Sequence, residues 1–197
     1  MNHSAFALQI ALRYRDGEGQ RDRLRRAVGS GAPAMSYRQK GEYFRRLAEA
    51  LLPGNASFDY GIWDYFDDDA RAQKEYATWA EGLGGKEART SPAPAPPPGG
   101  YRDAAEARRY LVFTAALLMR HGSASDRAVF AAQRDLSGPA LWTRQTFVRL
   151  VATLGAMSST GVVADTVYLI PGDDPSYALT PDDLKHPQFH YLREISG

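Results

Sequence analysis

The stretch YLVFTAALLM, residues 110–119, decides the fold, because no other run in the chain is so nearly continuous in bulky apolar residues. Such a run is typical of a central β-strand that is covered on both faces, although a buried helix has the same composition. The run is also much shorter than the roughly 20 apolar residues that a membrane-spanning helix needs. We therefore expect a buried strand here and no membrane insertion.

Three further strands are predicted from the spacing of apolar residues. In residues 6–12 every second side chain is large and apolar, which predicts a strand with one buried face. Residues 58–64 alternate in the same way, and residues 162–170 are rich in β-branched and aromatic side chains. Each of these segments is followed by turn residues or by the start of a helical pattern.

Helices are predicted between the strands, where apolar residues recur every three or four positions. Ser36 and Gln39 have the spacing of a capping box, and Ser125 is expected to cap a later helix. The predicted helices span residues 18–28, 36–51, 67–79, 125–136, 142–157 and a short segment that begins at 180–183.

Residues 84–100, GGKEARTSPAPAPPPGG, are predicted to form an exposed connector, because they hold five of the twelve prolines and four of the eighteen glycines. Proline lacks an amide donor and fixes φ, so this segment suits neither a helix nor an inner strand. The connector separates a first half, residues 1–83, from a second half, residues 101–197. Each half has the order strand, helix, strand, helix, which suggests a duplication, and we expect both halves to form one integrated domain.

The predicted fold class is α/β, with α+β as the alternative. About four strands would form one sheet, and the helices would cover it. Strands that are joined by helical crossovers are expected to be parallel, with right-handed connections.

The formal net charge of +1 conceals an alternation along the chain. The balance of Lys and Arg over Asp and Glu is +5 in residues 1–50, −4 in 51–100, +4 in 101–150 and −4 in 151–197. Overall neutrality gives little non-specific attraction to nucleic acid. We expect blocks of opposite sign to meet, either between the two halves or between two chains.

The last third of the chain carries short motifs in a recognisable order: a helix that ends in Leu-Gly, a serine turn, an aliphatic strand, an acidic loop, Leu-Thr, an acidic pair and a proline. These are Leu154-Gly155, Ser158-Ser159, Val163–Ile170, Asp173-Asp174, Leu179-Thr180, Asp182-Asp183-Leu184 and Pro187. The order resembles the family named Domain of Unknown Function 1517, whose central and opening strands resemble residues 110–114 and 7–12. The resemblance implies an uncharacterised soluble domain of bacteria and plastids. It implies no activity and supplies no catalytic residues.

Several kinds of chemistry are absent from the sequence. The chain has no cysteine, which removes disulfides, thiolate metal sites and a cysteine nucleophile. It also has no Gly-x-Ser-x-Gly nucleophile elbow and no glycine-rich phosphate loop. We expect no cofactor. The alternative to a non-catalytic protein is a small-ligand-binding or hydrolytic enzyme that uses Asp173, Asp174 and a histidine in a cleft.

Two histidines near the end of the chain have the spacing of metal ligands. His186 and His190 are four residues apart, as two ligands on one turn of helix would be. Pro187 interrupts such a helix. Surface histidines are therefore the favoured interpretation, and no metal site is predicted.

A basic stretch lies in the first predicted helix. Arg21, Arg23, Arg25 and Arg26 would meet phosphate groups in a complex with nucleic acid. Arginines on a short helix more often form a solvated face, so nucleic-acid binding is kept only as an alternative.

Aromatic residues are more numerous around residues 60–79 than a core needs. Trp63, Tyr65 and Phe66 crowd one predicted strand, and Trp79 follows on the next helix. Alternation places Tyr60 on one face of that strand and Trp63 and Tyr65 on the other, so they do not all enter one core. Together with the charge blocks, these residues predict a cytoplasmic, non-catalytic protein-interaction or adaptor domain, whose partner is another protein or a second copy in a homodimer.

Overall fold

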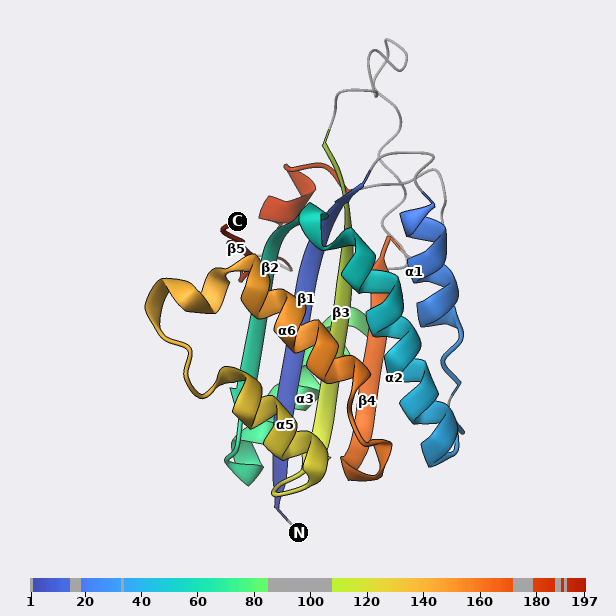
Figure 1. Ribbon diagram of the computed structural model, residues 1–197, viewed down its shortest axis with the longest axis vertical. Coiled ribbons are helices and arrows are strands. Elements are labelled where there is room, and N and C mark those ends of the chain that lie inside the picture. Colours follow the sequence, from blue (N-terminus) through green and yellow to red (C-terminus); the bar gives the residue numbers. More distant parts are fainter. Residues whose placement is uncertain are drawn as a thin grey trace.

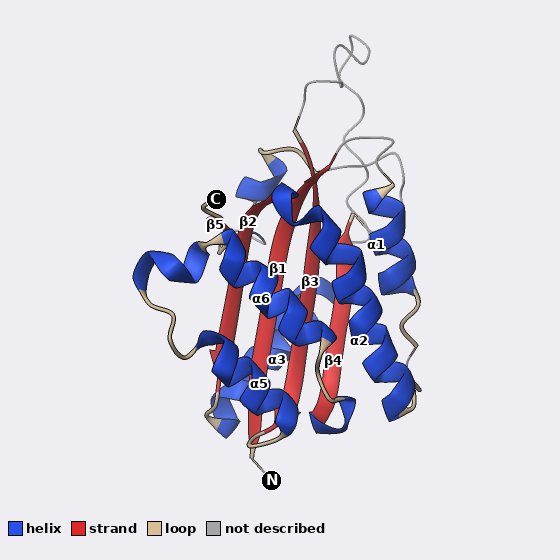
Figure 2. Ribbon diagram, viewed as in Figure 1, coloured by secondary structure: helices blue, strands red, loops and turns tan. Residues whose placement is uncertain are grey.

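The computed structural model describes residues 2–14, 19–32, 34–84, 108–171, 179–186, 189 and 191–197 (Figures 1 and 2). The predicted connector at 84–100 lies outside these residues except for Gly84, which ends a helix. One five-stranded sheet contains strands from both halves of the chain. The strands are β1 (His3–Tyr14), β2 (Phe58–Phe66), β3 (Arg109–Arg120), β4 (Val162–Ile170) and β5 (Arg193–Glu194).

Five α-helices and four short 3-10 helices are described. The α-helices are α1 (Gln20–Gly29), α2 (Tyr37–Leu51), α3 (Asp69–Gly84), α5 (Ala124–Gln133) and α6 (Arg144–Gly155), and the 3-10 helices are η1 (Leu52–Ser57), η2 (Gly138–Trp142), η3 (Ser159–Gly161) and η4 (Asp183–Lys185). The short C-terminal helix that the sequence predicts is thus only one 3-10 turn. None of the described helices is both long and apolar enough to cross a membrane.

The predicted α/β class is confirmed, but the predicted parallel pairing is wrong. The strand order is β4-β3-β1-β2-β5, and every neighbouring pair is antiparallel. A single crossover helix would return the chain to the end where the previous strand began. Here the β1–β2 and β3–β4 connections each contain two helices, α1 with α2 and α5 with α6, so β2 and β4 each start where the previous strand ended and run the other way (Figure 1).

The two halves repeat the same order of elements. The first begins β1-α1-α2-β2 and the second begins β3-α5-α6-β4. If β1 is exchanged with β3 and β2 with β4, the order β4-β3-β1-β2 and all its antiparallel pairings are unchanged. Elements of the two halves can therefore be compared place by place, with β2 corresponding to β4 and the α5–α6 connection to the α1–α2 connection.

Helices cover both faces of the sheet. On one face lie α1, α2, α5 and α6, and their buried side chains form the main core with alternate residues of β1 and β3 (Figure 2). On the other face lies α3, behind the sheet in Figure 1. The prediction that β1 buries only one of its faces is therefore wrong, because Ala5, Ala7 and Ala11 on its second face are also buried. Their small side chains allow a second layer to approach the strand closely.

The edge strand β4 is irregular near its start. Its register with β3 shifts between Leu118 and Met119, which pair with Ala164 and Val162 respectively. Val163 is the extra residue of this bulge, and its side chain is 49% exposed. A bulge of this kind bends an edge strand and interrupts the pattern that another strand would need for pairing.

The capping residues of α2 and α5 test the helix starts that the sequence predicts. The capping box of α2 is confirmed: the Ser36 amide donates to Gln39 Oε1 at 2.9 Å, and the Gln39 amide donates to Ser36 Oγ at 3.4 Å. Prediction of Ser125 as a cap is wrong, because Ser123 caps α5. Ser125 is buried instead and donates to the Ser158 carbonyl at 2.6 Å. The helix starts early because Gly122, at φ 73°, supplies the preceding turn.

The helices α2 and α6 cross at a contact that leaves no room for a larger residue. A Cβ atom at Gly155 would lie 2.5 Å from the Cβ atom of Ala48. Glycine is thus required here for the close approach of two helices rather than for an unusual backbone angle.

Gly155→Ala is expected to lower the free energy of unfolding by about 1–2 kcal/mol, because the clash outweighs the better helix propensity of alanine. Urea unfolding would measure the change. Ala48→Gly in the Gly155→Ala background removes the clashing atom, so a double-mutant cycle should show a favourable coupling of about 1 kcal/mol. Strictly additive effects would contradict this account of the contact.

Candidate interaction surface

Strand β2 carries the aromatic residues that the sequence singles out. Trp63 and Tyr65 pack against the main core on the face covered by four helices. Tyr60 packs on the opposite face, beside Tyr110, with ring centroids 5.9 Å apart. The predicted division of these residues between the two faces is therefore confirmed.

Trp63 is held in place by the connection between α5 and α6. Its indole Nε1 donates to the Leu141 carbonyl at 3.0 Å. Beside it, the Arg193 guanidinium lies 4.6 Å from the centroid of the Trp142 ring, which fixes the start of the short strand β5 against this connection. Trp63 thus fills the space between β2 and the α5–α6 connection.

Tyr65 is held by a buried carboxylate. Its hydroxyl donates to Asp126 Oδ1 at 2.6 Å, and Asp126 Oδ2 accepts from the Gly122 amide at 2.7 Å. His121 Nδ1 lies 3.5 Å from the same carboxylate, whose side chain is only 4% exposed. The sequence gives no signal for this role of Asp126, because Tyr65 on β2 lies 61 positions away along the chain.

The pKa values of these two groups move in opposite directions. Burial raises the pKa of Tyr65 above its usual 10.0, and the hydrogen bond to Asp126 raises it further. Burial alone would also raise the pKa of Asp126. The neighbouring Ser4 and Tyr65 hydroxyls, the Gly122 amide and His121 outweigh burial, so the pKa of Asp126 falls below 3.8.

An exposed phenylalanine extends the aromatic surface. Phe130 on α5 is 47% exposed, and its ring centroid lies 6.3 Å from that of Tyr65. Sequence reasoning missed this residue, although a signal was present. Val129 and Phe130 are adjacent apolar residues, and Val129 enters the buried stripe of α5, so Phe130 has to point elsewhere.

The outer side of β2 is only partly paired. β5 pairs with Tyr60 and Gly61, and among the described residues no strand pairs with the outer side of residues 62–66. We call residues 62–66 together with Phe130 the β2 edge surface. It contains three of the four aromatic candidates, Trp63, Tyr65 and Phe66, all half-buried. Trp79 lies on α3, on the other side of the sheet, and is not part of it.

Charged side chains of α3 lie near Phe66 and Asp64 of the β2 edge surface. The Arg71 guanidinium lies 4.4 Å from the centroid of the Phe66 ring. Burial raises the pKa of Asp64 above 3.8, Glu75 raises it further and Arg71 opposes both. Asp64 is the central residue of the unpaired stretch 62–66.

The arginines of α1 divide between the two sides of the helix. Arg21 and Arg25 are half-buried, whereas Arg23 and Arg26 are exposed. Arg21 Nη1 donates to the Tyr14 hydroxyl at 3.3 Å, so at least one member of the stretch supports the fold.

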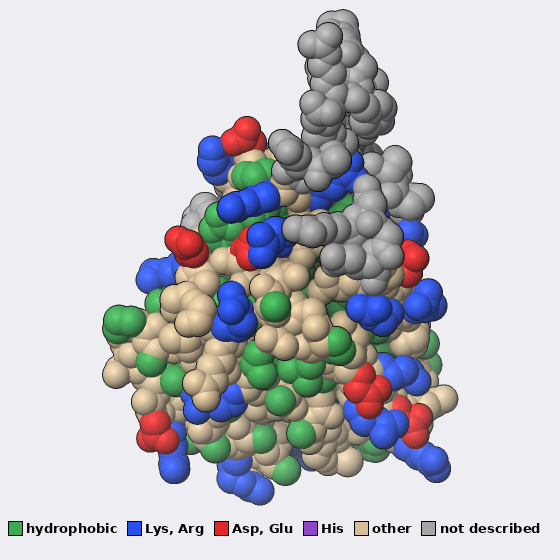
Figure 3. Space-filling model, turned by 45° about the horizontal axis from the view of Figure 1, so that its top comes forward, with side chains coloured by type: hydrophobic (Ala, Val, Ile, Leu, Met, Phe, Trp, Pro, Cys, Tyr) green, Lys and Arg blue, Asp and Glu red, His purple; other side chains and the backbone are tan. Residues whose placement is uncertain are grey.

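Figure 3 shows Lys and Arg side chains scattered over one face of the molecule, several of them beside Asp or Glu. On α2, for example, Arg38 lies 3.1 Å from Glu42 and Arg45 lies 3.9 Å from Glu49. Neighbouring charges of opposite sign weaken the field that attracts a phosphate backbone. Nucleic-acid binding by Arg21, Arg23, Arg25 and Arg26 stays a prediction.

The metal and acidic-loop candidates are mostly outside the part of the chain that the structure describes. This applies to Asp173, Asp174 and His190, whereas His186 directly follows η4. Within the described ranges no three His, Asp or Glu residues are grouped so that they could hold a metal ion.

Comparisons of the chain with protein-family models, with curated proteins and with solved structures found no match.

Asp126→Asn is expected to lower the free energy of unfolding at pH 7 by about 1–3 kcal/mol, because hydrogen bonds to a charged group are lost. The folded-state pKa of Asp126 is lowered, so its stabilisation is complete above the unfolded pKa and disappears as the pH falls through the folded value. Urea unfolding of variant and wild type should therefore converge at acid pH. Asp135→Asn, at an exposed aspartate, is the control and should have little effect at any pH. An equal loss at pH 7 and at acid pH would contradict the assignment.

Proposed function

We propose that this chain is a non-catalytic protein-interaction domain that binds its partner at the β2 edge surface, and that a second copy of the chain is such a partner. The observation that carries the proposal is the unpaired outer side of residues 62–66, flanked by the exposed ring of Phe130. An open strand edge offers a row of amide and carbonyl groups to which another strand can add.

The aromatic side chains at this edge are already fixed in position. Trp63 and Tyr65 hydrogen-bond within the chain through Leu141 and Asp126, so little side-chain entropy would be lost on binding. Phe130, nearly half-exposed, offers apolar area next to them. Fixed aromatic groups beside an open edge are the features expected at the centre of an interface.

Self-association would join two β2 strands in antiparallel fashion about a two-fold axis. Centred on the unpaired stretch 62–66, this pairing places Asp64 opposite the same residue of the second copy. Like charges that face each other across two strands weaken the pairing. The dimer should therefore be weak at neutral pH and tighter when Asp64 takes up a proton.

Analytical ultracentrifugation over a range of protein concentrations is expected to show a reversible dimer, with a Kd on the order of 10–100 μM, typical of a small interface. Phe130→Arg should weaken association about tenfold, because it places a charge in the apolar part of the interface. Tyr37→Arg is the matched control, since Tyr37 on α2 is 62% exposed and lies outside the β2 edge surface. A wild-type protein that stays monomeric at the highest concentration would refute self-association.

Asp64→Asn is expected to tighten the dimer at pH 7 by about threefold to tenfold, because it removes the repulsion between facing carboxylates. The raised pKa of Asp64 means that protonation starts at a higher pH than for an ordinary aspartate. Wild-type association should therefore strengthen as the pH falls from 7 towards 4, whereas Asp64→Asn should show little change. Parallel pH profiles for the two proteins would contradict the predicted register.

The other sequence predictions remain part of the proposal. Membership of the Domain of Unknown Function 1517 family rests on the motif order between residues 154 and 187 and would supply no activity. The cytoplasmic location and the enzyme alternative also stay predictions, and the acidic loop residues of that alternative, Asp173 and Asp174, lie outside the described part of the chain.

A further inference from the structure

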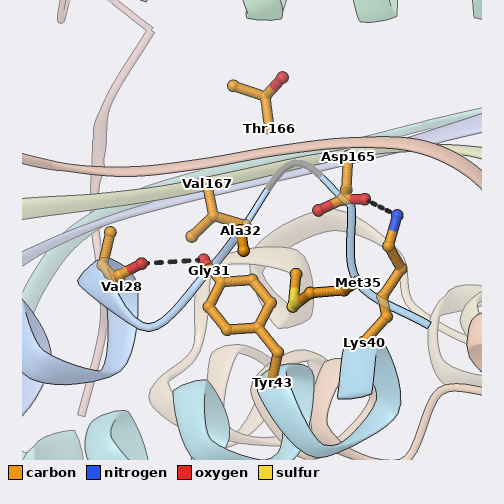
Figure 4. A pocket seen from close by; sticks show the side chains of 9 residues that line it. All are labelled: Val28, Gly31, Ala32, Met35, Lys40, Tyr43, Asp165, Thr166 and Val167. Carbon is orange, nitrogen blue, oxygen red and sulfur yellow. Dashed lines mark hydrogen bonds and ion pairs between the residues drawn. The ribbon is translucent and has the colours of Figure 1, made fainter. Parts of the chain in front are cut away.

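A pocket of about 340 Å³ opens at the β4 edge of the sheet, on the opposite side of the molecule from the β2 edge surface. It lies between α2, β4 and the connection from α1 to α2 (Figure 4). Its volume falls within the range of pockets that bind small molecules in proteins, which begins at about 300 Å³.

The pocket has an apolar part and a charged end. Val28, Met35, Val167 and the ring of Tyr43 line the apolar part. The Tyr43 hydroxyl points away from the charged end and donates to the Val28 carbonyl at 3.4 Å, and the residue, only 3% exposed, forms the buried floor of the pocket (Figure 4).

Lys40 and Asp165 form an ion pair at the other end of the pocket (Figure 4). Their side chains are only 20% and 14% exposed. The pair joins the basic block at the start of the chain to the acidic block at its end. Because the lysine neutralises the carboxylate, an uncharged ligand can approach Asp165 without a large electrostatic penalty, and the carboxylate still has lone pairs that accept hydrogen bonds.

The corresponding place in the other half of the fold is filled by a tryptophan. In the comparison of the two halves, β4 corresponds to β2, and the α1–α2 connection corresponds to the α5–α6 connection. Between β2 and the α5–α6 connection lies the indole of Trp63, whose N–H is donated to an oxygen of the chain, the Leu141 carbonyl. On β4 the inward-facing residues are the smaller Asp165 and Val167, and the space is open.

We propose that this pocket binds a small planar aromatic molecule that carries an N–H donor, the chemistry of indole. The ring lies against the partly exposed side chains of Met35 and Val167, and the N–H is donated to the Asp165 carboxylate. The ligand thus occupies the place that Trp63 fills in the other half. This proposal does not depend on the proposed function, because it concerns the other edge of the sheet.

Titration of the full chain with indole, followed by isothermal calorimetry, is the first test. We expect saturable binding with a Kd on the order of 0.1–1 mM, as for a small fragment. Benzofuran has the same shape but no N–H and should bind at least tenfold more weakly, because a hydrogen bond to a charged group is lost. No saturable binding, or equal affinity for the two compounds, would overturn the proposal.

Variants locate the site. Val167→Trp should fill the pocket and abolish indole binding, whereas Val163→Trp, on the same strand at the exposed bulge, should bind like the wild type. Ala32→Trp blocks the pocket from an exposed position in the α1–α2 connection, so it tests the same point without a change in β4. Retained indole affinity in a folded Val167→Trp or Ala32→Trp protein would place the binding elsewhere and refute the assignment.

A parallel titration tests whether the pocket prefers a free indole or the indole ring of a tryptophan in a protein segment. N-acetyltryptophan amide represents a tryptophan in a protein segment, whereas indole represents a free small molecule. We expect indole to bind more tightly, and tighter binding of the capped amino acid would overturn the commitment to a small molecule.

Discussion

The pairing of β1 with β3 is the interaction on which the rest of the structure depends. Twelve residues of each strand pair, from His3 with Arg120 to Tyr14 with Arg109, and both strands are buried on both faces. Among the described residues the only other strand pairing between the two halves is the two-residue contact of β5 with β2. Each half alone would leave its first strand as an open, apolar edge.

The layers follow from the composition of these two strands. Large side chains such as Phe6, Leu8 and Phe113 face the four helices and fill the space beneath them. Alanines on the second face of β1 leave a shallow surface on which α3 can lie. The same double burial explains why Gln9 and Thr114, which face each other in this pair, bond to each other: Gln9 Nε2 donates to Thr114 Oγ1 at 2.9 Å.

Local signals in the sequence predicted the elements better than their arrangement. The apolar run 110–119 and the capping box at Ser36 depend on neighbouring residues, and both predictions were correct. Strand direction depends instead on the number of helices in each crossover and on where they pack. The sequence predicts two helices in both the β1–β2 and the β3–β4 connection, whereas parallel strands follow only when such a connection holds a single helix.

The sequence likewise predicts some features of the candidate site and not others. Alternation in β2 correctly assigned Trp63 and Tyr65 to one face. The carboxylate that fixes Tyr65 comes from residue 126, and the ring that extends the surface comes from residue 130, so neither was visible in the pattern of β2. The pocket at β4 was also hidden, because Lys40 and Asp165 are 125 positions apart and meet only through the fold.

The bulge at Val163 has a consequence for how large an assembly can become. A sheet with two regular edges can grow without limit, because every added copy exposes a fresh edge for the next. Here a contact through β2 would leave β4 at both outer ends, and at each end the ladder is interrupted by the extra residue. The bulge would therefore act as a terminator, so that association through β2 stops at two chains and does not continue into a fibre.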